Sequence, residues 1–380
     1  MIKRTLQELC LNITDGKHGD CENEENSGYY FISCKDIFDG QINYKNARQI
    51  TKADFEETHK RTMLEVDDIL LTNSGTIGRM AFVADREATT KTTFQKSVAI
   101  IKPDKQKVLP RYLYYQLQNC VPQFINSSNG SAQKNLLLST MRTFQIEIEE
   151  NREKQEKIAD TLSAYDDLIE NNQKQIKLLE EAAQRLYKEW FVDLRFPGHE
   201  NTKIVDGVPE GWNRTNINEI LTFHRGYDLT KNEMKAGRYP VVGSTTVIGY
   251  HNEFKIKGPG IVTGRSGSLG KYQFIWDNFW PHNTSLYISD YKDHNIFFVY
   301  SLLQTVDFAS LNNGGAIPTL NRNVLSNIEV IEPTDELQEM FAKIAEAQYR
   351  KIRNLEKQNN QLKMARDVLL PKLMSGEVEV

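Results

Sequence analysis

The sequence lacks a run of eighteen or more apolar residues, which is the length that a membrane-spanning helix needs. The stretch from Met1 to Leu11 mixes Lys3, Arg4 and Glu8 with apolar residues, so it has no continuous apolar core of the kind found in signal peptides. These two absences exclude an integral membrane protein. We therefore expect a cytoplasmic protein with no membrane partner.

Cysteine is scarce and unpaired in the sequence. Cys10, Cys21, Cys34 and Cys120 are the four cysteines among 380 residues, and none forms a Cys-x-x-Cys pair. His18 lies near the first three, but the spacings match no common zinc pattern. We therefore expect reduced, inert thiols and no metal ion, with a metal site as the minor alternative.

An excess of positive charge is also missing. The chain has 47 Lys and Arg against 51 Asp and Glu, for a net charge of −4. Residues 1–149 carry 19 basic and 19 acidic side chains, and residues 207–333 carry 11 of each. Neither segment is basic as a whole, unlike many nucleic-acid-binding domains. If the protein binds DNA, its positive charge must gather on one face, or a partner must supply much of the phosphate contact.

Catalytic motifs are missing as well. Gly264–Lys271 looks like a phosphate-binding loop, but Gly264 comes one residue too early and Tyr272 stands where a Ser or Thr should bind magnesium. The sequence contains no dinucleotide, hydrolase or zinc-protease motif, and no Asn-Pro-Pro-aromatic run of the kind found in amino-methyltransferases. These absences argue against an enzyme.

What the sequence does contain is a long internal repeat. Ser74–Gly78 reads Ser-Gly-Thr-Ile-Gly and Ser266–Gly270 reads Ser-Gly-Ser-Leu-Gly, and a basic residue, Arg79 or Lys271, follows each. Apolar, strand-like runs flank both segments. Three more pairs of segments match in the same order: Leu6–Gly16 with Ile217–Gly226, Ser97–Ile101 with Ser285–Ile288, and the helical pattern Tyr112–Leu117 with Phe297–Leu302. The chain therefore contains two similar α/β units, residues 1–149 and 207–333.

A heptad pattern follows each unit, in residues 150–196 and 334–380, and a linker, residues 197–206, follows the first of these. The first seam steps alternately by four and three residues: Ile158, Leu162, Tyr165, Ile169, Asn172, Ile176, Leu179, Ala183, Leu186 and Trp190. The second seam is less regular and includes Ile352, Leu355, Asn359 and Leu362. Both patterns predict long helices, the first ending at Pro197-Gly198 and the second at Pro371.

Two such helices in one chain most simply pair with each other. The predicted fold is therefore α+β: two globular α/β units that alternate with two long helices, which pair as an antiparallel coiled coil. Asn172 and Asn359 lie on the seams, where a buried amide can fix the register of the helices. The alternative is that these two side chains are solvated.

The helix length suggests a ruler. Residues 158–190 span roughly 50 Å at ~1.5 Å per residue, while B-DNA advances ~34–36 Å per turn. A coil of this length could hold two units over DNA segments a turn or more apart, with an unread spacer between them. A scaffold that merely joins two domains is the alternative.

The Ser-Gly-x-x-Gly segments and other polar loops provide candidate DNA contacts. Glycine lets the backbone approach another surface, Arg pairs with guanine, and Asn or Gln pairs with adenine. Solvated turns are the alternative at each position. The candidates in the first unit are Ser74, Gly75, Thr76, Arg79, Lys91, Asn129, Gln133, Lys134 and Asn135, and those in the second are Arg225, Tyr227, Ser244, Arg265, Ser266, Lys271, His282, Asn283, Asn312 and Arg322.

Several segments resemble one known family, the specificity subunits of type I restriction–modification systems. They cover nearly the whole chain in the expected order: Gln155–Asn172, Lys188–Asp193, Val208–Trp212, Gly258–Gly270, Phe279–Thr284 and Leu369–Glu377. The first unit matches more loosely, and its best segment is Asp67–Leu71 with Gly75 and Gly78.

The resemblance implies that residues 1–149 and 207–333 are target-recognition domains, each of which reads one half of a bipartite site. The coiled coil would set the spacer and dock two methyltransferase subunits. The subunit itself would be non-catalytic and without a cofactor, since S-adenosylmethionine would bind the methyltransferase partner. Double-stranded DNA is the other expected partner, and motor-nuclease subunits can join. A coiled-coil scaffold without DNA readout and an enzyme that acts on DNA by itself are the alternatives.

Overall fold

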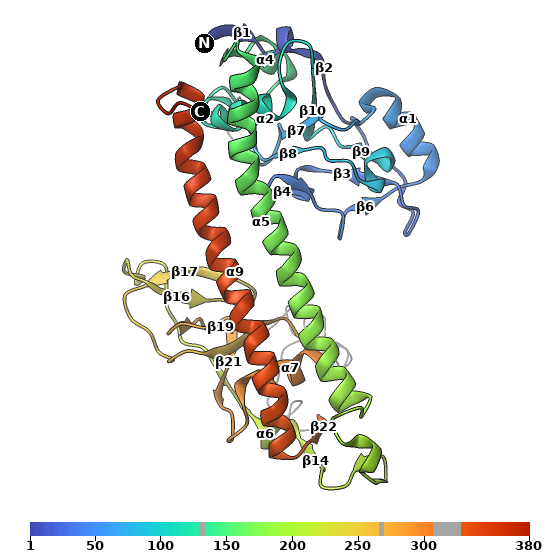
Figure 1. Ribbon diagram of the computed structural model, residues 1–380, viewed down its shortest axis with the longest axis vertical. Helices are drawn as coiled ribbons and strands as arrows, with labels where there is room; N and C mark the ends of the chain where they lie inside the picture. Colours follow the sequence, from blue (N-terminus) through green and yellow to red (C-terminus); the bar gives the residue numbers. More distant parts are fainter. Residues whose placement is uncertain (129–133, 266–269, 307–327) are drawn as a thin grey trace. The chain divides into compact units, whose positions relative to one another are not determined.

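The computed structural model describes residues 1–128, 134–265, 270–306 and 328–380 (Figure 1). They form two compact units: unit 1 comprises Met1–Glu170 with Asn359–Val380, and unit 2 comprises Asn171–Gln358. The long helices α5 (Arg152–Tyr187) and α9 (Asp335–Ser375) each contribute to both units. Within the described residues, no helix is both long and apolar enough to span a bilayer.

Unit 1 is built on two small sheets. The first has strand order β2-β10-β7-β8 and is antiparallel, and the second has the order β6-β3-β9, with β3 and β9 parallel. The strands are β2 (Cys10–Asp15), β3 (Tyr30–Ile32), β6 (Arg48–Gln49), β7 (Ile69–Thr72), β8 (Met80–Phe82), β9 (Thr92–Phe94) and β10 (Val98–Pro103). Two further pairs are β1 (Ile2–Thr5) with β11 (Gln145–Ile148), and β4 (Ile37–Phe38) with β5 (Gln41–Ile42).

The alternation of side chains explains why the central strand is apolar throughout. In β10, Ala99 and Ile101 enter one hydrophobic core, whereas Val98 and Ile100 enter another on the opposite face. The first core also takes in residues from α2 (Pro110–Asn119), α3 (Val121–Asn126) and α4 (Leu138–Thr143). The helix α1 (Lys52–Thr62) packs near β9.

Unit 2 repeats this topology. Its sheets have the strand orders β15-β21-β18-β19 and β17-β16-β20, and β16 and β20 are parallel. The strands are β15 (Thr222–Arg225), β16 (Tyr239–Val242), β17 (Val247–His251), β18 (Gly260–Gly264), β19 (Tyr272–Ile275), β20 (Trp280–Pro281) and β21 (Ser285–Asp290). The remaining elements are β12 (Ile204–Val205), β13 (Val208–Pro209), β14 (Asn213–Asn216), β22 (Glu329–Glu332), α6 (Ile217–Ile220) and α7 (Ile296–Thr305).

Strand pairing confirms the internal repeat and corrects one of its registers. Val98 lies opposite Thr72 in unit 1, and Ser285 lies opposite Gly264 in unit 2, so Val98 is the structural counterpart of Ser285. The predicted match of Ser97 with Ser285 is therefore wrong by one residue. Both segments begin with a serine that apolar residues follow, and this similarity favoured that match. The position of a residue in the sheet, however, is set by backbone pairing.

The long helices pack against each other in antiparallel fashion within each unit. In unit 1, Arg366 of α9 contacts Asp166 of α5, and the more carboxy-terminal Leu373 shares a core with the more amino-terminal Leu162. Unit 2 follows the same rule: Asn172 contacts Gln358, whereas Tyr187 stacks edge-on against Phe341. The predicted seam positions in both helices are buried or half-buried.

The seam asparagines are not solvated. Asn172 and Asn359 are both buried, and the side-chain amide of Asn172 donates to the Gln358 side-chain oxygen at 3.1 Å. Trp190 and Phe191, which lie in a π-helical turn after α5, are also buried and pack around Phe341.

The predicted end of the second helix at Pro371 is wrong. The helix α9 continues to Ser375 with Pro371 inside it. Leu370, Leu373 and Met374 are buried in the unit 1 core. The free energy gained by burying these side chains offsets the one helical hydrogen bond that proline cannot donate.

Candidate nucleic-acid interface

In unit 2, the described candidate residues gather where several strands end. Arg225 ends β15, Ser244 comes two residues after β16, and Arg265 follows β18 directly. His282 and Asn283 connect β20 to β21. We define the unit 2 loop surface as Arg225–Asp228, Gly243–Ser244, Arg265, Lys271 and His282–Thr284.

Short hydrogen bonds hold these loops to one another. The Ser244 hydroxyl donates to the carbonyl of Thr284 at 2.7 Å, and the backbone N–H of Arg265 donates to the same carbonyl at 3.2 Å. Both ring nitrogens of His282 are engaged, one with the Thr284 hydroxyl at 2.9 Å and the other with the Leu229 carbonyl at 3.2 Å. His282 therefore organises the surface.

Three exposed or half-exposed polar groups lie together on this surface. The Arg225 guanidinium lies 3.3 Å from the Asp228 carboxylate, and the Asn283 side-chain amide donates to the same carboxylate. Lys271 is exposed and directly precedes β19, whose first residue, Tyr272, pairs with Thr263 near the end of β18. Guanidinium, amide and carboxylate groups are the ones that read base edges in the major groove.

Tyr227 has a supporting position. Its hydroxyl lies 3.0 Å from that of Tyr287, and its ring is half-buried and contacts Trp280 edge-on. A tyrosine held in this way can shape the loop but has little freedom to reach a base.

Unit 1 presents the corresponding loops. Gly75, Thr76 and Arg79 are exposed between β7 and β8, and Ser74 forms an isolated antiparallel bridge with Asn135. Lys134 is exposed beside Asn135. The backbone N–H of Arg79 donates to the Thr72 hydroxyl at 2.9 Å. The exposed Arg79 guanidinium lies 3.5 Å from the Cys34 carbonyl.

One candidate lies elsewhere, and five cannot be placed. Lys91 precedes β9, whereas Gln95 and the other unit 1 loops lie at the opposite end of that strand, and the Lys91 ammonium lies 3.5 Å from Glu87. The candidates outside the described residues are Asn129, Gln133, Ser266, Asn312 and Arg322.

The structure adds residues that the sequence reading missed. The backbone N–H of Gln95 donates to the Ile32 carbonyl at 2.8 Å, as that of His282 donates to the Val242 carbonyl at 2.8 Å. Gln95 is thus the counterpart of His282, and Lys96 is the counterpart of Asn283. The correct alignment of the two repeats would have located them, but the alignment by residue type was shifted by one residue in this segment.

Asn73 is the second missed residue. Its backbone N–H donates to the Ser97 carbonyl, as that of Arg265 donates to the Thr284 carbonyl, so the two residues are equivalent. The Asn73 side chain is buried, and among the described residues its amide oxygen has no hydrogen-bond partner. A buried oxygen without a partner is costly to a fold.

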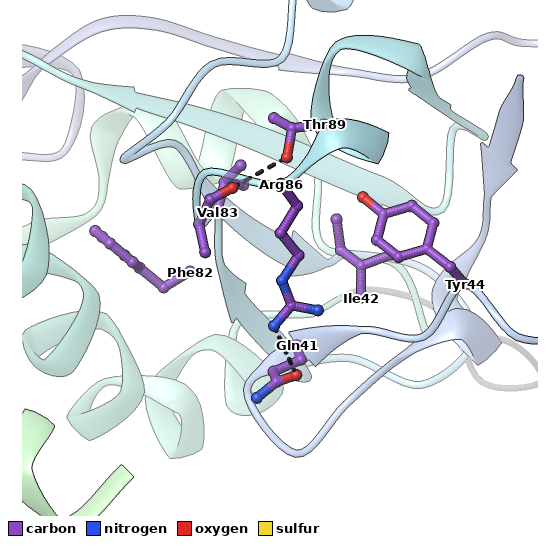
Figure 2. Close-up of a pocket in the computed structure, with 8 residues that line it drawn as sticks. Gln41, Ile42, Tyr44, Phe82, Val83, Arg86 and Thr89 are labelled. Atoms are coloured by element: carbon purple, nitrogen blue, oxygen red, sulfur yellow. Dashed lines mark hydrogen bonds between the residues drawn. The ribbon is translucent and has the colours of Figure 1, made fainter. Parts of the chain in front are cut away.

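A recess in unit 1 has a different character. Figure 2 shows Tyr44, Phe82 and Thr89 around it, with the Arg86 side chain reaching across to Gln41. The same guanidinium lies 3.4 Å from Glu170 of α5. The cavity volume is only about 20 Å³, far below the ~300–1,000 Å³ of ligand pockets. Arg86 therefore serves to join the globular part of unit 1 to α5.

The thiols and acidic groups do not assemble into a metal site in the described part of the chain. Burial raises the pKa of Cys10 to about 12 and that of Cys120 to about 11, and it also raises the pKa of Cys21. These thiols are therefore protonated at neutral pH and are poor metal ligands or nucleophiles.

Comparison with known proteins identifies the family. The model of the type I restriction modification DNA specificity domain matches residues 3–181 and 209–364. The MjaIX specificity subunit of Methanocaldococcus jannaschii is 28% identical over an alignment of 384 residues, which covers 92% of this chain and 87% of that protein. A putative specificity subunit of Mycoplasma genitalium is 24% identical over 288 residues, covering 71% and 72% of the two chains.

A solved structure has a similar fold. The type I restriction–modification S subunit from M. genitalium superposes with a TM-score of 0.59 at 20% identity, covering 98% of this chain and 95% of that one. Since the family model matches most of the chain in two segments, the protein belongs to the type I restriction–modification DNA specificity family, as a non-catalytic specificity subunit.

Proposed function

We propose that this chain chooses the DNA site for a type I restriction–modification complex, and that each unit reads one half of a bipartite double-stranded site. Residues 1–149 and 207–333 would be the two target-recognition domains. The observation that carries the proposal is the duplicated loop surface: equivalent backbone positions present different polar side chains in the two units, such as the exposed Lys96 and the half-buried Asn283. Two units with the same fold but different polar side chains at equivalent positions would recognise two different half-sites.

Partners would complete the binding of DNA. Both globular segments are close to neutral, so phosphate contacts would come in large part from two methyltransferase subunits, which would also hold S-adenosylmethionine. Motor-nuclease subunits can join the same assembly. Such a complex would act on DNA in the cytoplasm.

The helices would dock the methyltransferase subunits and set the spacer. Several large apolar side chains on α5 and α9 are exposed: Leu168, Met364 and Val368 in unit 1, and Leu178, Met340 and Ile344 in unit 2. Met340 and Ile344 are four residues apart, as are Met364 and Val368, so each pair lies on one face of α9. Such neighbouring exposed apolar side chains favour a protein partner over water. A scaffold without DNA readout is the second candidate, but it gives no reason for the polar loop surfaces.

An exchange of one reader tests the proposal. Residues 207–333 are replaced by the corresponding segment of another specificity subunit, and adenine methylation is mapped across the genome by long-read sequencing. We expect one half-site to change while the other half-site and the spacer stay the same. A change in both half-sites would show that the units are not independent readers, and unchanged methylation would favour the scaffold.

A further inference from the structure

A four-residue turn that begins with the last residue of the first strand of each main sheet is built alike in both units. It comprises Asp15–His18, which begins at the end of β2, and Arg225–Asp228, which begins at the end of β15. The second residue is glycine in both, because a Cβ at Gly16 or Gly226 would lie within about 2 Å of a backbone carbonyl oxygen, 2.0 Å and 2.1 Å respectively. We call this segment the reading turn.

The third residue of the reading turn is an anchor. The backbone N–H groups of Lys17 and Tyr227 each donate to a carbonyl of the neighbouring sheet at 2.8 Å. The Lys17 ammonium is held by Asp54 at 3.0 Å and by a second carboxylate of α1, and these hydrogen bonds raise its pKa. The Tyr227 hydroxyl is held by Tyr287. Neither side chain is free to contact a base.

The side chains of the first and fourth residues contact each other, and the order of the acidic and basic residue is reversed between the two units. In unit 1, His18 Nε2 lies 3.1 Å from an Asp15 carboxylate oxygen. In unit 2, the guanidinium of Arg225 lies 3.3 Å from the Asp228 carboxylate. The acidic group is thus first in one turn and fourth in the other.

The fourth residue is the one that both turns present to the outside. The His18 side chain is 62% exposed and that of Asp228 is 75% exposed. Asp15 is buried and is also bound by Arg61 of α1, so it acts as a support for His18. In unit 2, Arg225 and Asn283 orient Asp228 in the same manner.

We propose that the fourth residue of the reading turn, His18 in unit 1 and Asp228 in unit 2, is a base-reading residue that makes the two half-sites differ. The inference rests on the proposed function and names residues within it. A carboxylate can only accept hydrogen bonds, so Asp228 selects a base with an exposed amino group, foremost cytosine through N4. Arg225 offsets the repulsion between this carboxylate and DNA phosphates. His18 keeps Nε2 on Asp15 and offers Nδ1 to its base.

The test uses the variants His18→Ala and Asp228→Ala in the chromosomal gene, with genome-wide methylation maps as the readout. Each variant is expected to relax one base position in one half-site, a different half for each variant, with roughly five- to 150-fold loss of discrimination at that position. Asp228→Asn is expected to shift the preference at the same position toward adenine, since an amide pairs with adenine.

Matched controls lie beyond strand ends that face away from the reading turns. Lys105 follows the far end of β10 in unit 1, and Glu253 follows the far end of β17, which is in the second sheet of unit 2. Lys105→Ala and Glu253→Gln should both leave the motif unchanged. Thermal unfolding of each purified variant shows whether it folds. A folded His18→Ala or Asp228→Ala variant that keeps the wild-type motif overturns the inference. If the exchange of residues 207–333 still moves one half-site in that case, the proposed function stands without it.

Discussion

At the scale of single residues, the loops depend on a few positions where the backbone geometry admits only one residue type. Gly16 and Gly226 could be matched from the sequence, because both follow a strand-like run at the same place in the repeat. The Ser-Gly-x-x-Gly register likewise places Asn73 opposite Arg265, but Lys96 could not be matched, since its equivalence to Asn283 follows from hydrogen bonds between distant segments. Loop positions of this kind have no periodic signal in a sequence.

The glycine of the reading turn should be intolerant of a methyl group. In Gly226→Ala, the new Cβ would lie within about 2.1 Å of the His282 carbonyl oxygen, so the turn or the sheet must shift. We expect a loss of about 1–3 kcal/mol in the free energy of unfolding, measured by denaturant titration. Glu253→Gln serves as the control and should differ from the wild type by less than about 0.5 kcal/mol.

The cysteines should differ in reactivity. Cys10, Cys21 and Cys120 are buried, and burial raises the pKa of each thiol, whereas Cys34 is half-buried. In the native protein at pH 8, a thiol-specific chromogenic reagent should titrate one cysteine rapidly, and Cys34→Ser should abolish that phase. In denaturant all four should react. Rapid reaction of two or more native thiols would contradict the buried placement.

At the scale of elements, the two long helices were the clearest prediction, because a heptad seam is a local, repeating signal. The end of α9 was not predicted correctly. A proline such as Pro371 ends an isolated helix, but here the helix continues because Leu370 and Leu373 are buried in the unit 1 core. The parallel pairing of β3 with β9, and of β16 with β20, also escaped prediction. These strands are short, and their partners lie far along the chain.

Positions on α9 should separate folding from docking. Leu373→Ala removes a buried side chain and should lower the free energy of unfolding by about 2–5 kcal/mol. Met364→Ala removes an exposed one and should change stability by less than about 0.5 kcal/mol. By the proposed docking, Met364→Ala should nevertheless weaken co-purification with the methyltransferase subunit. Wild-type levels of that subunit would remove Met364 from the docking face.

At the scale of the whole molecule, the chain is a tandem duplication of one α/β design, each copy followed by a long helix. Residues Met1–Glu170 and Asn359–Val380 form one compact unit, so the final helix returns to the amino-terminal globular part. Antiparallel packing within each unit accounts for this return. By the proposed function, the length of the coil sets the spacer between the two half-sites.

Lengthening the coil tests that link. Four residues are inserted after Asn172 in α5 and four beside Gln358 in α9, where the two helices face each other. Four residues are slightly more than one helical turn, so the seam stays nearly aligned while the coil grows by ~6 Å. We expect the half-sites to stay the same and the spacer to lengthen by about two base pairs at ~3.4 Å each. An unchanged spacer in the methylation map would refute the ruler mechanism.

The sequence by itself determined the duplication, the two long helices and the family, because repeated letters and heptads are local signals that survive without knowledge of contacts. The tertiary structure decided which loops converge. Backbone pairing brought Asn73 beside Ser97 and Arg265 beside Thr284, and it corrected the register of the repeat by one residue. The tertiary structure also lets α9 continue through Pro371, because the free energy gained by burying core side chains exceeds that of one helical hydrogen bond.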